Sequence, residues 1–280
     1  MTNDPRWLLE FKRNVYSQSG EDGVLERVLD LLPEKNAWCV EFGAWDGIHL
    51  SNVRNLTETR GYAAVLIEAD AGRFATLQAN VASNPKIIAL RRLVGFGADD
   101  SLDTILRQTP VPGDFDLLSI DIDGNDYHVW KALSSYAPKV VCVEFNPTIP
   151  TDIDFVQPAD PSVNQGASLL ALTHLAAEKG YALVAVLISN AVFVKAEYFP
   201  LFEIDDNAPA ALREDLSLVT QMFVGYDGRI FLRGAQRLPW HGLAMKEDSM
   251  QALPKIVRRY PASYSLLQRI LFRCYRALAH

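Results

Sequence analysis

Residues 38–47 read Trp-Cys-Val-Glu-Phe-Gly-Ala-Trp-Asp-Gly, a short apolar run that ends in a glycine-containing turn. Such a run predicts a buried β-strand over Trp38–Phe42, followed by a turn at Gly43 and then a helix. Further apolar runs follow, with helical patterns at 73–81 and 127–135 between them. These strands are expected at Tyr62–Ile67, Ile87–Leu90, Asp116–Ile122 and Val140–Phe145. The alternation predicts an α/β fold, a parallel sheet with helices on both faces.

The sequence on either side of this alternating region predicts further elements. Helical spacing precedes it, and Ser19 and Asp22 stand where a capping box would place them. A helix is predicted at 168–179, with hairpins at 181–194 and 222–233, the second about Asp227-Gly228. We therefore expect three parts along the chain. They are an N-terminal helical segment at 1–35, the α/β domain at 36–245 and a helical tail at 246–280.

Composition and charge narrow the class of protein. The chain has 280 residues and is 49% apolar, which predicts a folded protein with a full core. Its three cysteines are far apart in sequence, so neither a disulfide framework nor a zinc cluster is expected. The N-terminus is polar and no apolar run reaches 18 residues, so we expect a cytoplasmic protein without a signal peptide or membrane span.

The charge is unevenly distributed. Residues 255–280 contain six basic residues and no acid, and the whole chain carries −7, which leaves −13 for residues 1–254. An acidic body argues against nucleic acid as a partner. Apolar residues recur at helical spacing in 263–280 beside three arginines, which predicts a basic amphipathic helix. Such a helix could lie at the inner membrane face, or pack on this chain or on a second copy.

Two strand ends predict a cofactor site. Gly43 and Gly47 flank the turn after the first strand, and Glu68 ends the second strand. In open α/β sheets, nucleotides bind at the carboxyl ends of strands, and an acid there can accept hydrogen bonds from ribose hydroxyls. These residues indicate an adenosine-containing cofactor. A plain strand-to-helix turn and a solvated carboxylate are the alternatives.

Acids also follow the fourth and fifth strands. Asp121 and Asp123 lie in Ser119-Ile-Asp-Ile-Asp-Gly-Asn-Asp126, and Glu144 and Asn146 alternate on the next strand. Oxygen ligands of this kind suit Mg²⁺ or Mn²⁺, so these four residues are predicted as metal ligands. An Asx-turn at Asp123 and Asn125 is the alternative.

Histidines and a further acid complete the predicted site. Asp121, Asp123 and His128 form the predicted catalytic group. Asp126 and His241 are predicted to contact the acceptor, His241 because it lies in the loop Leu238-Pro-Trp-His-Gly242. The sequence contains neither a Gly-x-Ser-x-Gly elbow nor a Gly-Lys-Ser/Thr phosphate loop, which disfavours serine hydrolysis and nucleotide hydrolysis.

Together these motifs resemble the FkbM-like S-adenosylmethionine-dependent methyltransferases. They are Glu41-Phe-Gly43-x-x-x-Gly47, Glu68 and Ser119 to Asp126. The resemblance is closest to a bacterial branch with Ser-Gln-x-Gly-Glu-Asp-Gly, here Ser17 to Gly23, Glu-x-Asn-Pro (Glu144 to Pro147) and Gly-Tyr-Asp-Gly (Gly225 to Gly228). Many FkbM-like members have Val-Glu-Gly where this chain has Ile122-Asp123-Gly124.

This resemblance covers about residues 15–245 and implies a Rossmann-like class I methyltransferase fold with a seven-stranded, mostly parallel sheet. S-adenosylmethionine is then the expected cofactor. Its implied contacts are Gln18, Glu41, Gly43, Gly47, Glu68, Asp99 and Asp100. The implied activity is O-methylation of a glycan or sugar hydroxyl or of a natural product. A non-catalytic binding module and an NAD-type enzyme are the alternatives.

Overall fold

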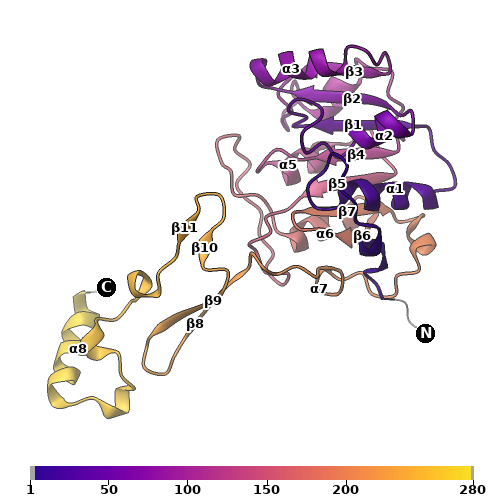
Figure 1. The fold of residues 1–280 in the computed structure, drawn as a ribbon. Coiled ribbons are helices and arrows are strands. Elements are labelled where there is room, and N and C mark those ends of the chain that lie inside the picture. Colours follow the sequence, from indigo (N-terminus) through magenta and orange to yellow (C-terminus); the bar gives the residue numbers. More distant parts are fainter. Residues whose placement is uncertain (1–3, 279–280) are drawn as a thin grey trace. The chain divides into compact units, whose positions relative to one another are not determined.

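The computed structural model describes residues 4–278, which form two compact units (Figure 1). The first unit ends at Asp215 and the second begins at Leu216. The predicted boundaries at 35 and 245 differ from this division, because the N-terminal residues pack into the core of the first unit. Residues 1–3 and 279–280 of the predicted end segments lie outside the described residues.

The first unit is built on a seven-stranded sheet in the order β3-β2-β1-β4-β5-β7-β6. β1 to β5 are parallel, and β7 runs antiparallel to both β5 and β6. This order and this single reversed strand are those of the class I methyltransferase fold, so the predicted fold class is confirmed. The strands are β1 (Trp38–Phe42), β2 (Ala63–Glu68), β3 (Ile87–Arg91), β4 (Leu117–Ile120), β5 (Val140–Glu144), β6 (Tyr181–Val186) and β7 (Asn190–Lys195).

Helices connect these strands. From β1 the chain steps outward to β2 and β3, then crosses back to β4 and steps the other way to β5. Right-handed crossovers in opposite directions place the connecting helices of the two halves on opposite faces of the sheet (Figure 1). The helices are α1 (Glu21–Leu31), α2 (Arg54–Thr59), α3 (Ala71–Val81), α4 (Leu102–Leu106), α5 (Asp126–Ala132), α6 (Leu169–Glu178) and α7 (Pro209–Leu212), with 3-10 turns η1 (Trp7–Phe11) and η2 (Phe199–Phe202).

The N-terminal segment joins the same core. Leu8 of η1 and the apolar side of α1 are buried among residues of the sheet. The predicted capping box is wrong: α1 is preceded by Gly20 in a left-handed conformation, and no side chain caps it. Asp22 instead folds back, and its Oδ2 accepts hydrogen bonds from the backbone N–H groups of Val15, Tyr16 and Ser17. The motif at 17–23 therefore closes a loop over the start of the helix.

The amino ends of the central strands are joined by a buried ion pair. The Lys139 ammonium lies 2.6 Å from a carboxylate oxygen of Asp116, and both side chains are almost inaccessible. The same carboxylate accepts hydrogen bonds from the backbone N–H groups of Asn36 and Ala37. These contacts connect the entry to β1 with the entries to β4 and β5.

The second unit contains the predicted Asp227-Gly228 hairpin as a separate two-stranded sheet. Gly228 has a φ of 76°, the conformation that such a turn requires. A shorter strand pair and 3-10 turns lead from it to the last helix. The elements are β8 (Thr220–Val224), β9 (Ile230–Gly234), β10 (Arg237–Leu238), β11 (Leu243–Ala244), η3 (Glu247–Met250), η4 (Lys255–Val257), η5 (Pro261–Ser263) and α8 (Leu266–Leu278). No helix among residues 4–278 is long and apolar enough to span a bilayer.

Candidate active site

The strand order reverses between β1 and β4, and the loops after these strands meet there. Gly43 has a φ of 73°, and a Cβ atom on it would collide with the carbonyl oxygen of Asp121. Gly47 has a φ of 72°, and a Cβ there would collide with Leu77 of α3. Close packing against the backbone therefore requires glycine at position 43, and the left-handed backbone conformation favours glycine at position 47. These two glycines shape the crevice at the switch point, where open α/β sheets bind ligands.

Glu41 faces the loop after this turn. It is buried, and its carboxylate accepts hydrogen bonds from the Ser51 hydroxyl at 2.6 Å and the Asn52 N–H at 2.8 Å. Burial raises the pKa of Glu41 to about 7, although these hydrogen bonds favour the ionised form. The side chain predicted to touch the cofactor thus also anchors residues 51–52.

Glu68 lies at the end of β2 beside the same turn. One carboxylate oxygen accepts a hydrogen bond from the Trp45 N–H at 2.9 Å, and the other accepts one from the Asp70 N–H at 2.7 Å. Each carboxylate oxygen can accept a second hydrogen bond. The residue is 5% exposed, and its carboxylate retains acceptor capacity beside the turn.

Trp45 is a site feature that the sequence reasoning missed. It has a φ of 49°, which is unusual for a bulky residue, and its ring is largely exposed. The Arg73 guanidinium lies 4.2 Å from the ring centroid, and His49 contacts the ring edge-on. The only sequence signal was the position of Trp45 between Gly43 and Gly47.

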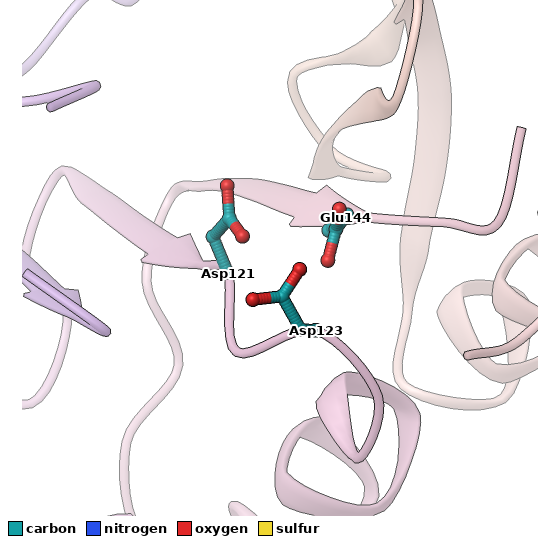
Figure 2. A group of neighbouring side chains, drawn as sticks. All are labelled: Asp121, Asp123 and Glu144. Carbon is teal, nitrogen blue, oxygen red and sulfur yellow. The ribbon is translucent and has the colours of Figure 1, made fainter. Parts of the chain in front are cut away.

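Three carboxylates converge at the ends of β4 and β5. Oxygen atoms of Asp121, Asp123 and Glu144 all lie within 4.8 Å of one another (Figure 2). Asp123 has a φ of 57°, which turns the chain after β4 and brings its side chain back toward the other two. Three of the four predicted metal ligands are therefore together; we refer to them as the acidic triad.

The acidic triad lacks basic partners. In the described part of the chain, no lysine, arginine or histidine forms an ion pair with any of its members. Burial, followed by the charges of neighbouring carboxylates, raises the pKa values of Asp121 and Glu144 well above their ordinary values. Asp121 and Glu144 therefore hold their protons more tightly than ordinary carboxyl groups do.

Asp126 organises the loop that carries the triad. Its carboxylate accepts hydrogen bonds from the backbone N–H groups of Ile122 and Gly124, both at 2.9 Å. The residue is 3% exposed, and each of its oxygens accepts one of these hydrogen bonds. Asp126 thus supports the turn that carries Asp121 and Asp123, and its contact with the acceptor stays a prediction.

His128 and Asn146 lie near the triad with their own partners. The His128 Nε2 atom is 2.8 Å from the carbonyl oxygen of Gln157. The Asn146 carboxamide accepts hydrogen bonds from Thr148 and donates to the carbonyl oxygen of Gln165. His128 thus connects α5 to the irregular segment after β5, and the Asn146 side chain is turned toward the same segment.

This irregular segment forms a pocket of about 480 Å³. Asn164, one of its lining residues, donates a hydrogen bond to the carbonyl oxygen of Asp123, so the pocket adjoins the triad loop. The sequence between Pro147 and Gln165 has no helical or strand period, so no sequence pattern predicted the pocket. Its lining residues are Asn146, Thr148, Ile149, Pro150, Ile153, Phe155, Asn164 and Gln165.

The remaining predicted site residues lie in three other loops. Asp100 accepts a hydrogen bond from the Gly97 N–H in the loop after β3, and Asp99 beside it is exposed. Gln18 is exposed in the loop before α1. His241 belongs to the second unit, where it is exposed in the turn between β10 and β11.

Comparisons with known proteins found similar solved structures at low sequence identity. The N-terminal domain of EvdMO1 with SAH bound is 10% identical, with 64% of this chain and 82% of that chain covered and a TM-score of 0.43. TrmK from M. capricolum in complex with SAH is 10% identical, with 61% and 67% covered and a TM-score of 0.38. A SAM-dependent methyltransferase from Aquifex aeolicus is 11% identical, with 68% and 96% covered and a TM-score of 0.37. No family model matches the sequence, and no curated protein matches it.

Proposed function

We propose that this protein is an S-adenosylmethionine-dependent O-methyltransferase. The observation that carries the proposal is the acidic triad beside the switch-point crevice of a class I methyltransferase sheet. The sequence motifs shared with FkbM-like enzymes support a sugar, glycan or natural-product hydroxyl as the acceptor. The acidic body of the chain supports an acceptor other than nucleic acid, in a cytoplasmic setting.

The residues around Glu68 fit the adenosine part of this cofactor. A carboxylate with spare acceptor sites suits ribose hydroxyls, which are hydrogen-bond donors. The turn between Gly43 and Gly47 holds Trp45 beside this carboxylate, with Arg73 on its ring. When bound, S-adenosylmethionine supplies an electrophilic methyl group on a sulfonium centre.

We assign deprotonation of the acceptor to the acidic triad. A hydroxyl acceptor must lose its proton as its oxygen attacks the methyl carbon. A carboxylate whose pKa is raised by burial is a stronger base than an ordinary aspartate, which suits Asp121 to this step. Asp123, the exposed member, can reach an acceptor held in the adjoining pocket.

A divalent cation is the second way in which the triad could act. Three carboxylates provide hard oxygen ligands, which Mg²⁺ and Mn²⁺ prefer. A cation there would neutralise the mutual repulsion and acidify an acceptor hydroxyl. We expect chelation to abolish methyl transfer and added Mg²⁺ or Mn²⁺ to restore it. Full activity in chelator, with no ion bound, would leave the base mechanism alone.

Calorimetry tests the cofactor assignment against both alternatives. We expect S-adenosylhomocysteine to bind and NAD to give no heat. Binding of NAD alone would identify an NAD-type enzyme. Binding of S-adenosylhomocysteine without methyl transfer in a broad acceptor screen would favour the non-catalytic module.

The Glu68→Gln variant sharpens this test. It keeps the shape of the side chain but removes the charge, so S-adenosylhomocysteine should bind about 10-fold more weakly, or about 1.4 kcal/mol. Glu178→Gln, at an exposed position on α6, is the matched control and should bind like the wild type. Equal affinities for both variants would remove Glu68 from the site.

A further inference from the structure

The last helix of the chain uses only one side for packing within its unit. In α8, the Phe272 ring contacts the Tyr264 ring with centroids 5.7 Å apart, and the Gln268 amide donates to the Ile256 carbonyl at 2.8 Å. The Tyr275 hydroxyl donates to the carbonyl oxygen of Ala252. At 3.6 residues per turn, these three residues lie on the same side of the helix. The aromatic side of α8 is therefore its packed side.

The leucine-rich side of α8 is left exposed. Leu266 is 77% exposed, Leu267 is 61% and Ile270 is 50%. Leu271 and Leu278 extend the same surface to the end of the described helix. We call these five residues the apolar stripe. Exposed apolar surface of this kind on a helix is costly in water and marks a contact surface.

Arginines border the apolar stripe. Arg269, Arg273 and Arg276 lie on the flank between the packed side and Leu266, as the helical period requires. Residues 255–280 contain three further cations and no acid. A second copy of α8 packed against the stripe would therefore bring like charges together without a carboxylate to pair them. An anionic lipid surface offers both an apolar interior and compensating phosphate charge.

We propose that α8 lies in the plane of an anionic membrane surface, with the apolar stripe inserted among the acyl chains and the arginines at the headgroups. This is independent of the methyl-transfer proposal, because it uses only residues of the second unit. It brings the protein to the membrane surface without a spanning segment. Binding should weaken as salt rises, because salt screens the arginines.

Co-sedimentation of the full chain with vesicles tests this proposal. We expect sedimentation with vesicles of phosphatidylcholine and phosphatidylglycerol, and none with phosphatidylcholine alone, at about 100 mM salt. The triple variant Arg269→Gln, Arg273→Gln and Arg276→Gln should bind at least ~10-fold more weakly. The double variant Leu267→Glu and Leu271→Glu should bind as weakly as the triple variant. Leu93→Glu, at an exposed leucine of the first unit, is the matched control and should bind like the wild type.

The opposite results would overturn the proposal. Wild-type protein that stays in solution with both kinds of vesicle excludes a membrane role. Unchanged binding by the double glutamate variant excludes the apolar stripe. If the wild type is instead a dimer that Leu267→Glu dissociates, α8 is a subunit interface. Circular dichroism of each variant establishes that it is folded, and the exposure of the substituted residues leads us to expect that it is.

Discussion

Acidic residues lie at both ends of the β4–β5 strand pair, but they have different hydrogen-bond and ion-pair partners there. At the amino ends, Asp116 is buried and is held by the Lys139 ammonium and by two backbone N–H groups. At the carboxyl ends, Asp121, Asp123 and Glu144 face one another, and no ion pair is formed with any of them among residues 4–278. One end pairs its carboxylate with a cation, and the other brings three carboxyl groups together without an ion pair in the described part of the chain.

This difference separates a structural acid from the acids that we propose to be functional. A buried carboxylate with a full set of donors holds the chain together and has nothing to offer a ligand. Carboxylates that repel one another reduce stability and persist where they bind a proton, a cation or a substrate. Deep burial does not mark the proposed functional acids, since Asp116 is the most buried of the four.

Breaking the amino-end pair should produce the largest effect on folding. Lys139→Met leaves the Asp116 charge buried without its cation, so the free energy of unfolding should fall by about 3–5 kcal/mol. Urea unfolding of the variant and of Lys86→Met, at an exposed lysine, measures the difference. Methyl transfer per folded molecule should be unchanged. A loss below about 1 kcal/mol would mean that the pair contributes no more than a surface ion pair.

Removing one charge from the carboxyl end should affect chemistry instead. Asp123→Asn should lower turnover by about 10²–10³-fold, equivalent to about 3–4 kcal/mol, because an amide does not accept the proton and binds a cation more weakly than a carboxylate does. Asparagine tolerates the left-handed conformation of residue 123, so the variant should fold.

Cofactor affinity separates chemistry from binding in this variant. S-adenosylhomocysteine should bind Asp123→Asn within a few-fold of the wild type. Asp152→Asn, at an exposed position, serves as the control for turnover. Normal turnover in Asp123→Asn would exclude a catalytic role for the exposed member of the triad.

Ionisation of Glu41 should make the free energy of unfolding depend on pH. Its pKa in the folded protein is about 7, above its ordinary value of 4.5, so the folded state retains a proton that the unfolded chain releases. The contribution is fully present below pH 4.5 and is lost as the pH rises through 7. In full it amounts to about 3–4 kcal/mol.

Urea unfolding at several pH values measures this loss. The free energy of unfolding of the wild type should fall between pH 5 and 8, and that of Glu41→Gln should fall by about 2–3 kcal/mol less. Glu178→Gln should follow the wild type. If the free energies of unfolding of the wild type and of Glu41→Gln fall equally between pH 5 and 8, the Glu41 carboxylate is already ionised at the lower pH.

Apolar runs predicted the central strands well because β1, β2, β4 and β5 are buried on both faces of a parallel sheet. They also predicted three members of the acidic triad, since the carboxyl ends of adjacent parallel strands meet at one edge. Asn146 was expected there too. Its orientation depends on Thr148 and Gln165, which lie in a segment without periodic pattern.

The amino-acid sequence alone predicts the succession of strands and helices, the hairpin at Asp227-Gly228 and the strand ends at which acids gather. Local backbone preference and the burial of apolar runs act over a few residues, so they can be recognised in the sequence. The donors that each acid contacts follow instead from the tertiary structure. Asp116 forms an ion pair with Lys139, and Glu68 accepts a hydrogen bond from the Trp45 N–H. The acidic triad forms no ion pair with a basic side chain among residues 4–278. These partners come from distant parts of the sequence, and the packing of whole elements brings them together.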